Sequence, residues 1–221
     1  MRHYHTYDEL IRNNTRWALD MLRRDTRYFE TLAEYQKPPF LYIGCSDSRV
    51  PIDTLTQTEP GELFIHRNIA NQVIRTDMNL LSAVEFAIET LQVRHIVVCG
   101  HYECGGVTGA YRDDLVGLKE NWTSGIKDIV REHRAELDAI PNESDRLDRL
   151  TELNVLAQVQ NLFKISGIER LIQAAGREPN SYYPRLHGWV LDIRSGLIKE
   201  LDLPLEQWKA EGSVPANYQP F

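Results

Sequence analysis

Two cysteines and one histidine stand directly after two short apolar runs of the sequence. Cys45 comes just after the run 40–43, and His101 and Cys104 come just after the run 94–99. Such runs, each followed by a polar turn, are typical of buried strands and the loops at their carboxyl ends. Two thiolates and one imidazole form the ligand set of zinc sites that keep one coordination position open. We therefore predict one zinc ion per chain at these residues; singly, they would be ordinary core cysteines and a loop histidine.

A carboxylate and a guanidinium alternate with Cys45 along the first loop. In an extended backbone Cys45, Asp47 and Arg49 point to the same side. Asp47 can accept a hydrogen bond from a water molecule on the zinc, or it can bind the zinc directly as the fourth ligand. Arg49 can hold Asp47 away from the metal by a bidentate pair. The alternative is an ion pair that only braces the loop.

The composition suits one domain with a complete hydrophobic core. The chain has 221 residues, of which 42% are hydrophobic, and its 25 basic and 32 acidic residues give a net charge of −7. No basic stripe is present, so we do not expect a nucleic acid partner. Three cysteines are too few for a disulfide framework, and two thiolate ligands require a reducing compartment. No apolar run has membrane-spanning or signal-peptide character, so we expect a cytoplasmic protein with no membrane partner.

The hydrophobic periodicity predicts an α/β fold with a central, mainly parallel sheet flanked by helices. We expect a single domain over 1–221, with a helical arm at 1–38, an α/β core at 39–203 and a tail at 204–221. The expected elements are a long helix 8–35, strands 40–43 and 62–68, a helix 77–91, a strand 94–99, a helical turn within 103–112, helices 119–139, 144–163 and 168–175, strands 185–193 and 196–201, and a short helix 205–210. Asp77 is the expected N-cap of its helix. Both ligand loops should meet at one edge of the sheet.

The sequence resembles the β-class carbonic anhydrases from about residue 8 to residue 201. The resemblance rests on Cys-Ser-Asp-Ser-Arg at 45–49 and Gly-His-Tyr-Glu-Cys-Gly-Gly at 100–106. Further matches lie at 59–64, 66–71, 152–155 and 187–189.

The resemblance implies that Cys45, His101 and Cys104 bind zinc and that Asp47 and Arg49 form a catalytic dyad. It also implies reversible hydration of carbon dioxide to bicarbonate by zinc-bound hydroxide. Members of this class assemble as dimers, often paired into tetramers, and their first helix reaches across the partner subunit. The expected long helix at 8–35 agrees with such an arm, so we expect a dimer or a tetramer.

The class contains two types of site, and Glu59 indicates the bacterial type in which the aspartate can close on the zinc. Asp47 is then expected to bind the metal at low pH, and to return to Arg49 at high pH. We place Gly105 beside this site, in the pocket for substrate or bicarbonate.

The same type has a non-catalytic bicarbonate pocket built on a Val, an Arg, a Trp and a Tyr. Val50 and Arg67 match two of these residues, whereas Tyr42 stands at the Trp position and Leu191 at the Tyr position. With two of four contacts changed, we expect closing to depend on pH more than on bicarbonate.

Two other functions use the same residues. A hydrolase of carbon disulfide or carbonyl sulfide could have the same ligands, and only assays on both kinds of substrate separate it. A non-catalytic zinc-binding or thiol-redox protein is the other alternative. Arg49 beside Asp47 argues against that alternative, because a closed structural site needs no such pair.

Overall fold

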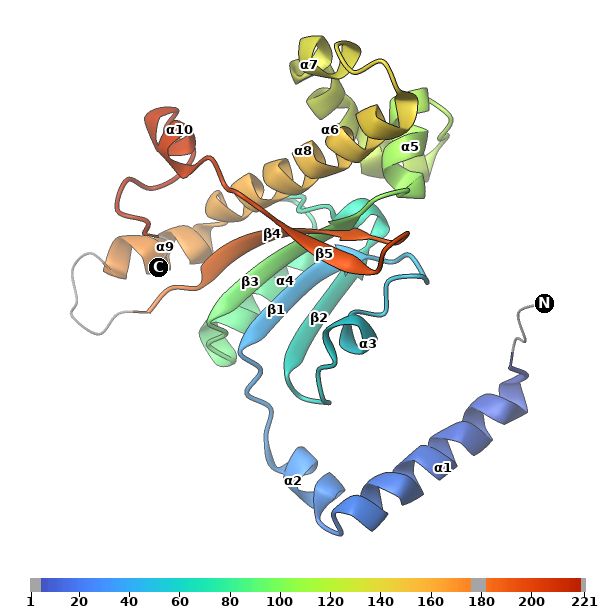
Figure 1. Cartoon of the computed structure of the whole chain (residues 1–221). Coiled ribbons are helices and arrows are strands. Elements are labelled where there is room, and N and C mark those ends of the chain that lie inside the picture. The colour runs from blue at the N-terminus through green and yellow to red at the C-terminus, as the bar shows by residue number, and fades with distance from the viewer. Residues whose placement is uncertain (1–4, 176–181, 220–221) are drawn as a thin grey trace. The chain divides into compact units, whose positions relative to one another are not determined.

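The computed structural model describes residues 5–175 and 182–219 of the chain (Figure 1). It divides the chain into two compact units, Met1–Lys37 and Pro38–Phe221. The first unit is a helical arm, and the second contains the sheet and all candidate site residues.

The arm begins with helix α1 (Tyr7–Arg24). Thr6 and Glu9 form a capping box, in which the Glu9 backbone N–H donates to the Thr6 hydroxyl and the Glu9 carboxylate accepts from the Thr6 N–H. No residue of α1 is buried, although Leu10, Ile11 and Trp17 are large apolar side chains. Within the arm, α1 therefore carries an exposed apolar surface.

The prediction of one continuous helix over 8–35 is wrong, because the arm breaks after α1 and resumes as α2 (Tyr28–Glu34). Asp25 caps α1 in an extended conformation, and its carboxylate accepts from the backbone N–H of Arg27 at 2.8 Å. Such a local side-chain bond competes with helical hydrogen bonding. Edge-to-face contacts of Trp17 with Tyr28 and Phe29 then hold the two helices together.

The second unit is built on a five-stranded sheet in the order β2-β1-β3-β4-β5. The first four strands are parallel, and β5 pairs antiparallel with β4 as the predicted hairpin. The strands are β1 (Phe40–Cys45), β2 (Leu63–Asn68), β3 (His95–His101), β4 (Arg185–Asp192) and β5 (Leu197–Leu201). The predicted α/β class and the mainly parallel sheet are confirmed, and β1, β2 and β3 end at the same edge.

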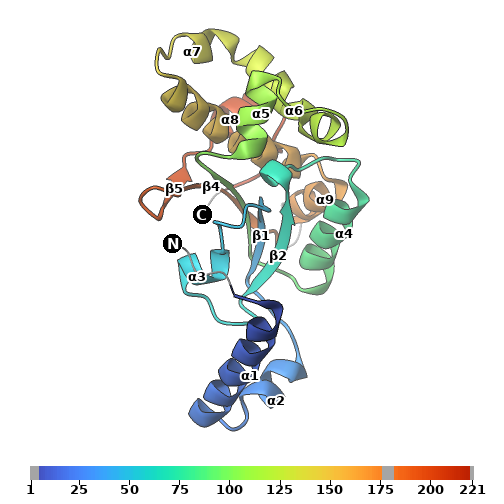
Figure 2. The same ribbon diagram turned by 90° about the vertical axis from the view of Figure 1, so that its right-hand side faces the viewer.

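Helices cover the two faces of the sheet unequally. Figure 2 shows α4 (Met78–Glu85) and α9 (Ser166–Ala175) on one side and the short α3 (Ile52–Thr56) on the other. The larger apolar core lies on the first side, where α8 (Glu143–Phe163) contributes Val155, Val159 and Leu162. Ile52 of α3 packs with Tyr42, Val97 and Cys99 on the other side.

The remaining helices follow the predicted order with changed boundaries. Asp77 caps α4 as predicted, by accepting from the Asn79 backbone N–H. The rest of that predicted helix is a π-helix, η2 (Phe86–Thr90), and the predicted helix 119–139 is divided at His133. The other helical segments are the 3₁₀ turn η1 (Ile69–Asn71), α5 (Gly105–Arg112), α6 (Leu118–Glu132), α7 (Arg134–Asp138) and α10 (Leu205–Ala210).

The segment after β5 is part of the core of this unit. Trp208, Val214 and Tyr218 are buried, and Tyr218 stacks edge-on against Phe163 of α8. The Tyr218 hydroxyl also accepts the backbone N–H of Leu186 in β4. The predicted helix 205–210 is confirmed as α10, but the sequence did not predict that the tail packs onto the sheet.

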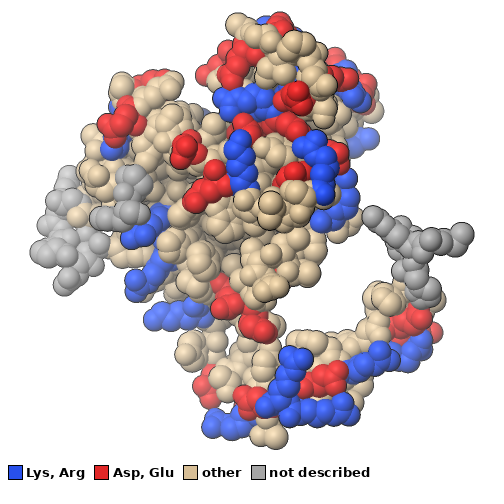
Figure 3. Space-filling view, in the orientation of Figure 1, with Lys and Arg blue, Asp and Glu red and all other residues tan. Residues whose placement is uncertain are grey.

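Surface charge is mixed where it is visible. Figure 3 shows acidic and basic side chains interspersed over the face of the second unit turned to the viewer. Among the described residues, no helix is both long and apolar enough to cross a membrane.

Candidate metal centre

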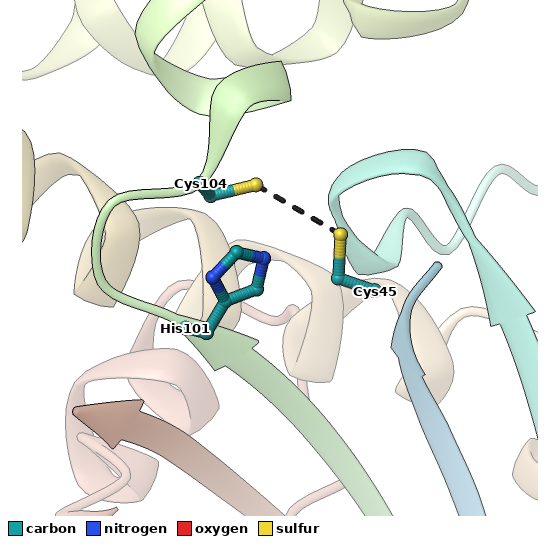
Figure 4. Close-up of side chains that lie close together, drawn as sticks. All are labelled: Cys45, His101 and Cys104. Atoms are coloured by element: carbon teal, nitrogen blue, oxygen red, sulfur yellow. Dashed lines mark hydrogen bonds between the residues drawn. The ribbon is translucent and has the colours of Figure 1, made fainter. Parts of the chain in front are cut away.

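Cys45, His101 and Cys104 converge at the carboxyl edge of the sheet, as predicted. Cys45 ends β1, His101 ends the neighbouring strand β3, and Cys104 precedes α5 (Figure 4). One potential ligand atom from each residue lies within 4.8 Å of the others, and all three residues are buried. The two sulfur atoms are 3.9 Å apart. A tetrahedral zinc ion with Zn–S distances near 2.3 Å separates two sulfurs by about 3.8 Å.

Nε2 of His101 is available to bind a metal, because the other ring nitrogen, Nδ1, makes a hydrogen bond. Its Nδ1 lies 2.9 Å from the carbonyl oxygen of Tyr102, so Nδ1–H donates there and Nε2 keeps its lone pair. Nε2 is buried and has no hydrogen-bond partner. A buried polar atom without a partner is costly, and a metal ion at this position removes that cost. The three residues therefore fit zinc.

The two thiols are unequal in acidity. The neighbouring thiol of Cys104 and the nearby imidazole of His101 lower the pKa of Cys45 to about 4. The same sulfur pair, together with burial, raises the pKa of Cys104 well above its usual range. Cys104 stands at the N-terminus of α5, where the helix dipole favours a negative sulfur once a cation offsets the repulsion between the two thiolates. A doubly deprotonated pair therefore requires a cation at the site.

Asp47 and Arg49 form the predicted bidentate pair. Arg49 donates from Nε to one carboxylate oxygen of Asp47 at 2.9 Å and from Nη2 to the other at 2.7 Å. This pairing lowers the pKa of Asp47 to about 2. The Asp47 carboxylate nevertheless lies 3.7 Å from Nε2 of His101, directly beside the candidate metal position. The structure thus has the arrangement in which Arg49 holds Asp47; movement of Asp47 onto the metal in acid stays a prediction.

Arg67 braces the first ligand loop (residues 45–49) from the neighbouring strand β2. Its Nε donates to the carbonyl oxygen of Cys45 at 2.9 Å, and its Nη2 donates to the carbonyl oxygen of Asp47 at 2.7 Å. Two charge-assisted bonds to backbone carbonyls fix the loop that carries one ligand and the dyad. Nε and Nη2 of Arg67 are therefore both bonded to backbone carbonyls of the first ligand loop.

Of the other residues assigned to the substrate or bicarbonate pocket, three are buried and one is exposed. Tyr42, Val50 and Leu191 are buried, whereas Gly105 is exposed at the start of α5. The Tyr42 ring fills the space beside Gly44, where an added Cβ would overlap it. Its hydroxyl is buried without a hydrogen-bond partner. An aromatic side chain thus occupies the region around Gly44.

Glu103 gains an explanation from the structure. It adopts a left-handed conformation with φ of 58°, which turns the chain between His101 and Cys104. Its carbonyl oxygen accepts from Nη2 of Arg49 at 3.2 Å, and its carboxylate lies 3.8 Å from Nη1 of the same residue. Arg49 thereby joins the two ligand loops.

Sequence reasoning missed two residues that hold the second ligand loop (residues 101–104). The Tyr102 hydroxyl donates to the carboxylate of Glu152 at 2.7 Å. Glu152 lies on α8 within six consecutive buried residues, 150–155. A carboxylate between Leu150 and Leu153, two residues of the helix's apolar stripe, is a signal in the sequence for a buried polar contact.

The chain matches the family model described as carbonic anhydrase over residues 40–198. Among curated proteins it is 39% identical to a carbonic anhydrase of Emericella nidulans, covering 90% of this chain and 84% of the relative. It is 37% identical to a carbonic anhydrase of Pseudomonas aeruginosa, covering 88% and 87%.

Solved structures give the same result for the fold. A tetrameric β-carbonic anhydrase of Sordaria macrospora superimposes with a TM-score of 0.82 at 39% identity, covering 88% of this chain and 96% of that chain. A Coccomyxa β-carbonic anhydrase in complex with acetazolamide gives 0.81 at 33% identity, covering 94% and 92%. The chain therefore belongs to the β class of the carbonic anhydrase family.

Proposed function

We propose that this chain catalyses the reversible hydration of carbon dioxide to bicarbonate and a proton at the site formed by Cys45, His101 and Cys104. The observation that carries the proposal is the convergence of these three ligands beside an aspartate that an arginine holds. A purely structural zinc site would use four protein ligands and leave no open position. Family membership supports the same reaction.

Cys45, His101 and Cys104 would hold the zinc ion, which would supply a Lewis acid able to acidify a water molecule at an open coordination position. The residues of the chain do the rest. Asp47 is ionised because of Arg49, so it can accept a hydrogen bond from that water molecule and orient it. Arg67 holds the backbone of the first ligand loop, and Arg49 holds the carboxylate of Asp47. Cys99 lies outside this set, and burial raises the pKa of its thiol to about 12.

The test is a stopped-flow assay of carbon dioxide hydration on the purified full chain, with zinc measured on the same sample. We expect one zinc per chain and hydration activity, and Cys104→Ser should lose both. Cys99→Ser is the matched control, because Cys99 is equally buried but belongs to a different cluster. A second assay with carbon disulfide separates the sulfur-compound hydrolase. Activity on carbon disulfide alone, or full zinc occupancy in Cys104→Ser, contradicts the proposal.

We also propose that the chain associates with itself through the arm. Its α1 exposes large apolar side chains, including Leu10, Ile11 and Trp17, along a helix with no buried residue. The Sordaria relative described as tetrameric supports self-association. Sedimentation of the full chain at micromolar concentration should give a dimer or a tetramer, and an active monomer contradicts this.

Two thiolate ligands suit a reducing compartment such as the cytoplasm.

A further inference from the structure

Tyr102, the residue that follows His101, is held from several directions. Its backbone N–H donates to the carbonyl oxygen of Leu191 in β4 at 3.0 Å. Its hydroxyl donates to Glu152 on α8 at 2.7 Å, and the guanidinium of Arg194 lies over its ring at 5.6 Å from the centroid. Two segments far apart in the sequence, α8 and residues 191–194 at the end of β4, therefore fix one side chain and its peptide group.

The partner of the Tyr102 hydroxyl is itself fixed. The side chain of Glu152 is only 12% exposed, and its carboxylate also accepts from Lys199 at 2.6 Å and from Arg149 at 3.0 Å. Burial by itself raises the pKa of Glu152, but the bonds from Lys199, Tyr102 and Arg149 outweigh it and hold the pKa below its usual range. Glu152 is thus a charged acceptor that can move little.

One hydrogen bond links the backbone of Tyr102 to the candidate ligand His101. The carbonyl oxygen of Tyr102 accepts Nδ1–H of His101 at 2.9 Å, which sets both the tautomer and the rotation of the imidazole. The next residue, Glu103, is in the left-handed region, so the peptide plane that carries this carbonyl sits at a tight turn. A shift of Tyr102 would therefore rotate the His101 ring and move Nε2 away from the two sulfurs.

We propose that Tyr102 is a positioning residue for His101, and that Glu152 and Arg194 keep it in place. The inference rests on the proposed function, because it concerns how one ligand of the same zinc site is oriented. It assigns a role to the charged groups of α8 and the β4–β5 hairpin, none of which touches the ligands. Hydrogen-bond partners of ligating histidines change metal affinity by about 10- to 100-fold.

The test compares Tyr102→Phe with Tyr111→Phe in the full chain loaded with zinc. Each change removes one hydroxyl that bonds a charged side chain, Glu152 in the first case and Arg146 in the second. The readouts are the rate of zinc transfer to a colorimetric chelator, the absorption spectrum of the cobalt-substituted protein, and the melting temperature. We expect Tyr102→Phe to release zinc about tenfold faster and to change the cobalt spectrum. Tyr111→Phe should leave both as in the wild type.

A double-mutant cycle links the effect to Glu152. Glu152→Gln alone should speed zinc release less than Tyr102→Phe does, because the amide oxygen still accepts the hydroxyl. In the Tyr102→Phe background the same change should add nothing to the rate.

The inference is overturned if Tyr102→Phe releases zinc within twofold of the wild-type rate with an unchanged cobalt spectrum, even if its melting temperature falls. Additive effects in the cycle would also overturn the link to Glu152. A wild-type chain that binds no zinc is a different result, since it contradicts the proposed function itself.

Discussion

The two loops that supply the candidate ligands are held by different kinds of contact. In the first ligand loop, residues 45–49, Arg49 pairs with Asp47 two positions away, and Arg67 comes from the adjacent strand. The second ligand loop, residues 101–104, depends on Glu152, 50 positions from Tyr102, and on the β4–β5 hairpin. The loop that carries Cys45 and the dyad is thus held largely from within itself and from the adjacent strand, whereas the orientation of the histidine ligand depends on a helix and a hairpin distant in the sequence.

The largest effect should come from the charge of the first loop. Asp47→Asn keeps the size of the side chain but removes the carboxylate that Arg49 holds, and a preorganised hydrogen-bonding group at the reacting atoms contributes about a hundredfold or more. We expect carbon dioxide hydration to fall by about that factor while one zinc per chain remains. A rate within threefold of the wild type would mean that the Asp47–Arg49 pair only braces the loop.

Sterics at the end of β1 should give the next largest effect. A methyl group at Gly44 would overlap the ring of Tyr42, which is buried and cannot swing out. Gly44→Ala should lower the free energy of unfolding by about 1–3 kcal/mol in a denaturant titration. In a Tyr42→Leu background the same change should cost much less. Equal costs in both backgrounds would show that Tyr42 does not fill this space.

Arg67 tests how far the first loop depends on its neighbour strand. Arg67→Gln removes the charge-assisted bonds to the carbonyls of Cys45 and Asp47, at a position exposed to solvent. We expect a loss of about 1–2 kcal/mol in stability. Arg112→Gln is the control, because the guanidinium of Arg112 makes one exposed ion pair with Glu143. Stability losses equal to that control would contradict the bracing role.

Acid stability tests the second loop. The folded-state pKa of Glu152 is below its ordinary value of 4.5, so its contribution is complete above that pH and is lost as the pH falls through the folded-state value. Glu152→Gln should therefore lower stability at neutral pH and flatten its decline below about pH 4.5. The pKa of Asp47 is also lowered, but Asp47 changes stability with pH in the same way in the wild type and in Glu152→Gln. Parallel stability curves for the two proteins would show that the Glu152 carboxylate contributes nothing through its charge.

Glu103 should give the smallest effect, although it stands between two ligands. Its carboxylate approaches Arg49 only at 3.8 Å, and both side chains are partly exposed, so the pair contributes at most about 0.5 kcal/mol. The bond from Arg49 to the Glu103 carbonyl is unaffected by Glu103→Gln. Activity and stability should stay close to the wild type, and a tenfold loss of activity would assign the carboxylate a direct role.

The contrast between the loops also explains what could be predicted from the sequence. The strands, the parallel order and the three ligands follow from apolar runs and from residue types at their ends, which are local features. The break at Asp25 was missed because the apolar spacing continues past it, while one side-chain bond to the Arg27 backbone interrupts the helix. The burial of Trp208 and Tyr218, like the contact between Tyr102 and Glu152, depends on segments that meet only in the folded chain.

The central claim is that two sulfurs and one imidazole nitrogen of this chain hold a single zinc ion. X-ray absorption at the zinc edge, measured on the purified full chain of known zinc content, tests it most directly. We expect one zinc per chain with two sulfur ligands at about 2.3 Å, the other ligands being nitrogen or oxygen. Zinc bound by four sulfurs, zinc bound without sulfur, or a chain that purifies without zinc and takes up none, would contradict the account.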